Sequence, residues 1–120
     1  MIYNEGELEM LREFILLPIV LTVLERDKKV IEKSELKTKF PYIEAINIAM
    51  RRITIELGKI NEQMQRKGLR VPKQVQSDFG IECIFWRKGK SDIFEMNWDL
   101  VRAETEIRMI AYITGVKDHS

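Results

Sequence analysis

The sequence contains one histidine and one cysteine, and this scarcity excludes most familiar catalytic and metal-binding chemistries. His119 is the penultimate residue, where a fraying tail cannot hold it against a nucleophile or a base. Cys83 lies in an apolar stretch without a histidine partner, which favours an inert buried thiol. One cysteine and one histidine cannot supply the usual ligands of a zinc site. We therefore predict no catalytic residue, no metal and no cofactor, and expect the protein not to be an enzyme.

The chain also lacks a long hydrophobic run. Its longest apolar segment, residues 14–24, is about half of the roughly 20 residues that a membrane span needs. The residues before this segment are acidic, and no small-residue cleavage site follows it, so it is a poor signal peptide. A single cysteine cannot form an internal disulfide, which suits the reducing cytoplasm. We expect a cytoplasmic protein that has no membrane partner.

No tract rich in glycine, proline or serine divides the sequence. With 120 residues and 45% hydrophobic residues, the chain has the length and composition of one folded domain covering residues 1–120. Gly80 and Gly89 are isolated, so no glycine-rich phosphate loop is present. The net charge is +1, but residues 28–73 carry +7 between acidic flanks of −4 and −2. This basic middle would suit an anionic partner or acidic surfaces of the same molecule.

The first predicted helix begins near Asn4, which forms a capping-box pattern with Glu7. The neighbouring acids Glu5, Glu7 and Glu9 are expected to form a solvated helix start. Pro18 removes a backbone donor and is expected to kink or divide the helix. Residues 14–24 are apolar on nearly every side, which is typical of a segment enclosed between other elements or subunits. The lysine-rich residues 27–39 are interpreted as a connector.

A long second helix gives the strongest periodic signal. It is expected to begin at Pro41 and to end at Gly68, which can adopt the left-handed conformation that closes a helix. Apolar residues recur along it at intervals of three or four, on a single stripe: Ile43, Ile46, Met50, Ile53, Leu57, Ile60 and Met64.

A β-hairpin and a third helix complete the predicted fold. We expect a turn centred on Gly89 and Lys90, with Arg87 paired to Asp92 and with one apolar face: Ile81 opposite Trp98, Cys83 opposite Met96, and Phe85 opposite Phe94. Asn97 is a suitable N-cap for the last helix, which should end before Gly115. Its apolar stripe is Leu100, Ala103, Ile107, Ile110 and Ala111. The fold class is therefore α+β, mainly α, with a kinked N-terminal helix, a long second helix, a β-hairpin and a C-terminal helix.

Three sequence segments carry a resemblance to a known family. These are Leu17 to Asp27, Lys29 to Glu32, and Lys39-Phe40-Pro41-Tyr42, of which Asp27 and Pro41-Tyr42 are the least generic positions. In these segments, and more weakly through most of the chain, the sequence resembles the YhjD-like small proteins of Bacillus and related Firmicutes. The resemblance implies a bacterial cytoplasmic protein. It carries over no catalytic residue.

A protein-interaction or regulatory module is the function that the sequence favours. The apolar surface of residues 14–24 exceeds what three helices and one hairpin are expected to cover, so burial against a second copy or a partner helix is predicted. Leu21, Leu24 and Trp86 are the candidate interaction residues, and a homodimer is the simplest assembly.

An alternative is a nucleic-acid-binding protein that resembles a winged helix. A helix, a basic connector, a second helix and a lysine-tipped hairpin follow in that order. Phosphate contacts would then come from two groups of basic residues, one on the second helix and one on the hairpin: Arg51, Arg52 and Lys59, and Arg87, Lys88 and Lys90. The length of the second helix and the modest excess of basic residues count against this alternative.

Overall fold

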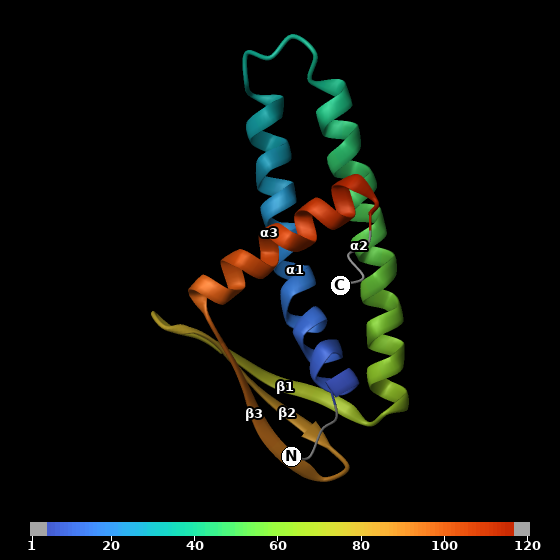
Figure 1. Cartoon of the computed structure of the whole chain (residues 1–120), viewed down its shortest axis with the longest axis vertical. Helices are drawn as coiled ribbons and strands as arrows, with labels where there is room; N and C mark the ends of the chain where they lie inside the picture. Colours follow the sequence, from blue (N-terminus) through green and yellow to red (C-terminus); the bar gives the residue numbers. More distant parts are fainter. Residues whose placement is uncertain (1–4, 117–120) are drawn as a thin grey trace.

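The computed structural model describes residues 5–116 and contains three helices and a three-stranded antiparallel sheet. In chain order, the elements are α1 (Glu5–Glu32), α2 (Phe40–Arg66), β1 (Leu69–Gln76), β2 (Gly80–Arg87), β3 (Lys90–Asn97) and α3 (Trp98–Thr114). Figure 1 shows α1 and α2 side by side as a helical hairpin. The sheet lies near one end of this hairpin, and α3 crosses both helices. The predicted α+β, mainly α, fold class is confirmed.

The first helix is longer than the sequence indicated. α1 passes through Pro18 as one helix and is not divided there, and it continues to Glu32 through the residues assigned to a connector. In its last turns, α1 packs against the rest of the protein mainly on one side. The residues on that side, Leu24 and Ile31, are seven positions apart, so the apolar pattern is too sparse to predict a helix. The connector between α1 and α2 is limited to residues 33–39. Asn4, the predicted cap, lies outside the described residues.

The second helix agrees closely with the prediction. α2 places Pro41 in its first turn and ends one residue before the C-cap Lys67. Gly68 follows with a φ of 68°, which is the left-handed conformation expected of a glycine that closes a helix. The buried residues of α2 all belong to, or lie beside, the predicted stripe: Ile46, Ala49, Ile53, Ile60 and Met64.

Strand β1 was not predicted. It contains Pro72, and most of its side chains are exposed, so it lacks the apolar alternation of a typical strand. β1 lies at the edge of the sheet, and its pairing with β2 is irregular between Arg70 and Lys73. An edge strand with such an irregularity tolerates a residue that cannot donate a backbone hydrogen bond.

The predicted pairing of the β2–β3 hairpin is wrong by two residues. Lys88 and Gly89 form the turn, both with positive φ (51° and 80°), and the pairing sets Phe85 opposite Asp92. Two such residues give a type I′ turn, whose twist matches that of the strands. Asp92 is accommodated because its Oδ1 accepts a hydrogen bond from the backbone N–H of Ile93 at 2.8 Å. A shift of two residues keeps every side chain on its face, so the predicted apolar face is retained.

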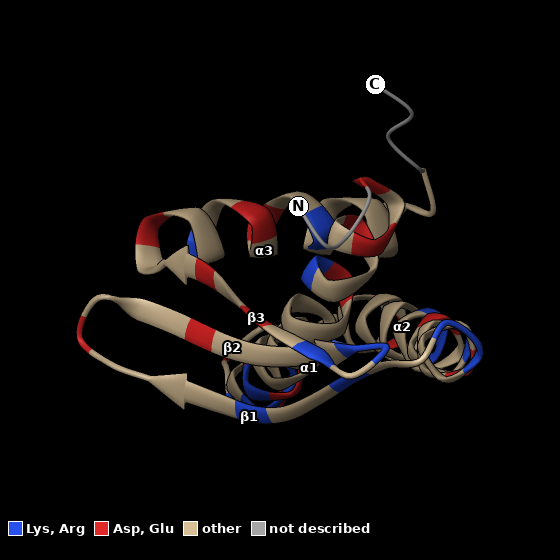
Figure 2. Ribbon diagram, turned by 90° about the horizontal axis from the view of Figure 1, so that it is seen from below, with Lys and Arg blue, Asp and Glu red and all other residues tan. Residues whose placement is uncertain are grey.

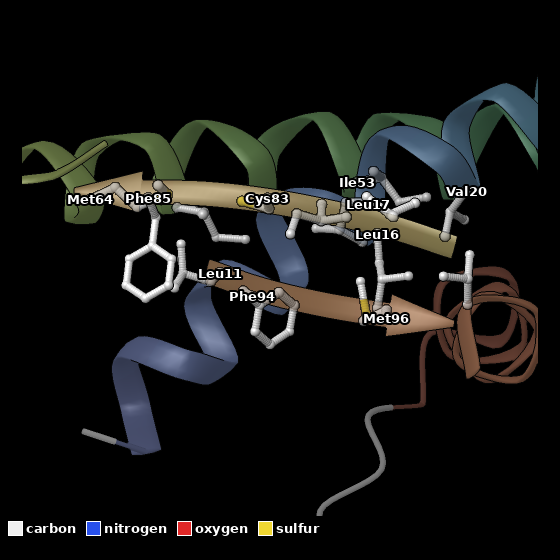
Figure 3. Close-up of a cluster of buried hydrophobic side chains, with 14 of the residues drawn as sticks. Leu11, Leu16, Leu17, Val20, Ile53, Met64, Cys83, Phe85, Phe94 and Met96 are labelled. Atoms are coloured by element: carbon white, nitrogen blue, oxygen red, sulfur yellow. The ribbon is translucent and has the colours of Figure 1, made fainter. Parts of the chain in front are cut away.

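The core joins the inner face of this hairpin to the two long helices. Phe85 and Cys83 of β2 are fully buried, and Phe94 and Met96 of β3 extend the same face. Figure 3 shows these side chains in one cluster with residues of α1 and α2, including Leu11, Leu16, Leu17, Val20, Ile53 and Met64. The apolar segment of α1 is thus enclosed within a single chain.

Burial of Cys83 predicts a loss of stability at alkaline pH. Desolvation raises the pKa of the Cys83 thiol from 9.0 to about 11. A raised pKa in the folded state means that the stabilising contribution is complete below pH 9.0 and is lost as the pH rises towards 11. We expect the free energy of unfolding, measured by urea denaturation, to fall across this range and to fall less in Cys83→Ala. Equal slopes for the two proteins would contradict this expectation.

Candidate interaction surface

Helix α3 is fixed at both ends. The side chain of Asn97 accepts a hydrogen bond from the N–H of Leu100 at 2.8 Å, which confirms the predicted N-cap. At the same end, the Trp98 indole donates to the Ser77 carbonyl at 2.7 Å. At the other end, Arg52 of α2 donates to the Tyr112 carbonyl at 2.8 Å. A cation at this position also suits the negative end of the helix dipole.

The middle of α3 is held by a buried arginine. Arg108 Nε lies 3.0 Å from each carboxylate oxygen of Glu13 on α1, and its Nη1 donates to Glu104 Oε2 at 2.8 Å. The Arg108 side chain is only 12% exposed. Burial by itself lowers the pKa of Arg108, but hydrogen bonds and charge from Glu13 and Glu104 outweigh that effect and raise it. The guanidinium therefore remains charged and fixes which face of α3 contacts α1.

The apolar stripe predicted for α3 faces outward, contrary to the usual orientation of an amphipathic helix. The face that packs inward carries Val101, Thr105 and Arg108. On the opposite face, Leu100 is 39% exposed, Ile107 50% and Ile110 65%. We call Leu100, Ala103, Ile107 and Ile110 the α3 outer stripe. These residues form an apolar helix face that the described residues leave largely uncovered.

The outer face of the sheet offers a smaller apolar area. Trp86 is 39% exposed and lies opposite Ser91, and the neighbouring pair Ile84 and Ile93 shares its face. Glu82 and Glu95 form the next pair on this face. Trp86, a candidate interaction residue, is thus partly accessible, but charged residues interrupt the surface around it.

The predicted interaction residues of α1 are placed differently. Leu24 is 1% exposed and belongs to the core, and Leu21 is half-buried against it. α2, α3 and the sheet cover most of this segment, so Leu24 is not accessible to a partner, contrary to the expectation, and little apolar surface of residues 14–24 remains uncovered. The sequence missed this because α3 covers α1 through the Arg108–Glu13 pair rather than through its own apolar stripe.

The basic residues proposed to contact nucleic acid do not form one surface. Arg87 pairs with the buried carboxylate of Glu7 at 2.9 Å, so Glu7 is not part of a solvated helix start. Arg52 donates a hydrogen bond to the Tyr112 carbonyl, and Arg51 Nη2 lies 3.5 Å from Glu44 Oε1. Lys59 is exposed on α2, whereas Lys88 and Lys90 lie at the hairpin turn. Figure 2 shows basic and acidic residues interleaved along the helices and strands.

Sites for small ligands are poorly developed in the described part of the chain. Two shallow hollows have volumes of about 360 and 430 Å³; the first lies beside Phe79 and Gly80, and the second lies between α1 and α2 beside Lys28 and Arg51. Residues 5–116 contain no group of three or more histidine, cysteine or acidic side chains placed to hold a metal ion. His119 lies outside the described residues. None of the helices described is long and apolar enough to cross a membrane.

Comparison with known proteins identifies a family for nearly the whole sequence. The family model described as YhjD protein matches residues 2–117. Neither the curated proteins nor the solved structures contain a significant match to the chain.

Proposed function

The chain belongs to the YhjD protein family, and we propose that it is a protein-interaction module that pairs with a second copy through the α3 outer stripe. The observation that carries this proposal is the orientation of α3. Its arginine-bearing face is buried, and its apolar face is exposed. Displaying large apolar side chains to water is unfavourable, so an outward stripe held by buried polar anchors favours a binding role.

The geometry of the stripe suits a helical partner. Its residues are spaced by three, four and three positions, which is the spacing of a seam between paired helices. The Arg52 and Arg108 contacts hold α3 in place before any partner arrives, which limits the entropy lost on binding. Full burial of an isoleucine side chain contributes about 1.5–3 kcal/mol. Ile107 and Ile110 would supply most of the stabilisation.

A second copy of the chain is the simplest partner, because it needs no binding surface other than the α3 outer stripe itself. An apolar stripe without a charge at its centre is complementary to itself across a two-fold axis, where the same patch from each chain meets. The acidic neighbours Asp99 and Glu106 lie along one edge of the stripe, where they remain in solvent. The free, buried thiol of Cys83 supports placing this assembly in a reducing cytoplasm.

The double variant Ile107→Asp/Ile110→Asp is expected to abolish self-association. Two carboxylates would have to lose water within an apolar contact, which costs several kcal/mol. Light scattering over a dilution series should give a dimer for the wild type and a monomer for the variant. Circular dichroism should remain unchanged, because both positions are exposed in the single chain.

A matched control adds the same charge elsewhere. Asn61→Asp/Gln65→Asp places two carboxylates on exposed positions of α2 and should leave the dimer intact. A monomeric wild type at high micromolar concentration would contradict the proposal. Retention of the dimer in the α3 variant would contradict it equally.

A further inference from the structure

The end of the α1–α2 hairpin combines lysines with exposed apolar side chains. We call residues 28–42 the hairpin tip. Figure 1 shows that the connector lies at the end of the molecule opposite the β2–β3 turn, and the longest dimension of the molecule is 55 Å. The tip carries five lysines against two glutamates, a net charge of +3, and contributes much of the basic middle of the sequence.

Large hydrophobic side chains project from the same tip. Phe40 is 73% exposed, Val30 63%, Tyr42 54% and Leu36 49%. Their position is unusual, since a solvated loop has no need of a phenylalanine and a leucine beside its lysines. The outward orientation of α3 does not account for them, because α3 crosses the hairpin away from the tip.

The tip is an ordered structure. Lys39 Nζ donates to the Glu32 carbonyl at 2.9 Å, which joins the start of α2 to the end of α1. Ser34 Oγ donates to the Ile31 carbonyl at 2.7 Å and accepts from the Leu36 N–H at 3.3 Å. These bonds order the connector without any partner, and Leu36 and Phe40 are exposed in this ordered state.

We propose that the hairpin tip docks the protein on the surface of an anionic phospholipid bilayer. The lysines would contact lipid phosphates, while Phe40, Leu36 and Tyr42 would enter the boundary between head groups and acyl chains. Long lysine side chains can extend from this boundary to the head groups, and aromatic residues are favoured there. This proposal departs from the expectation of no membrane partner, which rested on the absence of a spanning segment and not on surface binding.

The shape of the tip favours a bilayer over other anionic partners. A protruding end that carries hydrophobic groups requires a deformable apolar medium or a complementary groove. The phosphates of a nucleic acid would contact the lysines, but Leu36 and Val30 would remain in contact with water. A bilayer accommodates both the lysines and the apolar side chains without a preformed groove.

Vesicle co-sedimentation tests this proposal. The wild type should bind vesicles of phosphatidylcholine mixed with phosphatidylglycerol, should bind less as salt increases, and should not bind phosphatidylcholine alone. Lys33→Gln/Lys37→Gln should weaken binding roughly 30-fold, at about 1 kcal/mol for each lysine. Phe40→Ala should weaken it about tenfold or more.

Matched controls lie away from the hairpin tip, at the β2–β3 turn and in the β1–β2 loop. Lys88→Gln/Lys90→Gln removes the same charge from the β2–β3 turn, and Phe79→Ala removes a phenylalanine that is 86% exposed. Both control variants should bind vesicles as the wild type does. Absence of wild-type binding, or equal losses in the tip and control variants, would overturn the proposal. A wild type that ignores the vesicles but shifts DNA in a gel through Lys33 and Lys37 would overturn it in favour of nucleic acid.

Discussion

Replacing Phe85 by alanine is expected to destabilise the protein by about 3–5 kcal/mol. Phe85 is fully buried, and its ring lies in the cluster that joins the sheet to α1 and α2. The substitution removes both the transfer free energy of the ring and the packing of the residues around it. Urea denaturation followed by circular dichroism measures the change as a lower midpoint.

The control for Phe85 is again Phe79, which has the same side chain at the surface. Phe79→Ala should change the free energy of unfolding by less than about 0.5 kcal/mol. Similar effects at the two positions would contradict the placement of the core on the inner face of the hairpin. An effect confined to Phe85 would support that placement despite the shifted register.

Replacing Arg108 by methionine is expected to lower the free energy of unfolding. Removing one partner of a buried ion pair costs about 3–5 kcal/mol, and we expect a value near the lower end of that range. The change leaves Glu13 and Glu104 without their cation, although their side chains are 25% and 23% exposed, which moderates the loss. Arg102→Met is the control, because that arginine is 72% exposed and its ion pair with Asp99, at 3.5 Å, lies at the surface. Its removal should change stability by less than about 1 kcal/mol.

A double-mutant cycle separates the Arg108–Glu13 interaction from general damage. Adding Glu13→Leu to Arg108→Met removes the second buried charge along with the first, so part of the lost stability should return. Additive losses from the two substitutions would show that Arg108 does not hold α3 against α1 through Glu13.

Local signals in the sequence were sufficient to place most elements. α2 was predictable because one side of it is buried throughout, which gives an unbroken stripe from Ile46 to Met64. The limits of α3 were predictable because Asn97 and Gly115 act as caps within the helix's own segment. The inner face of the hairpin followed from simple alternation at Ile81, Cys83 and Phe85.

The features that were missed depend on contacts between distant residues. β1 pairs at an edge despite Pro72, and its own residues give little sign of a strand. The orientation of α3 depends on Arg108 meeting Glu13, 95 residues earlier in the chain. Periodicity shows that α3 has an apolar face, but only the position of that ion pair shows that the face points outward. The candidate surface therefore required the structure, and the predicted interface at Leu24 was wrong.

A distance measurement between labelled copies tests the proposed α3 pairing most directly. A spin label at Glu106→Cys lies on the exposed edge of the stripe, and the fully buried Cys83 does not compete for the reagent. Paired helices have axes about 8–10 Å apart, so pulsed electron resonance should give a short, narrow distance distribution between copies. A label at Ser91→Cys on the outer face of the sheet should give longer distances. Absence of a short distance at residue 106, or a shorter one at residue 91, would contradict pairing through α3.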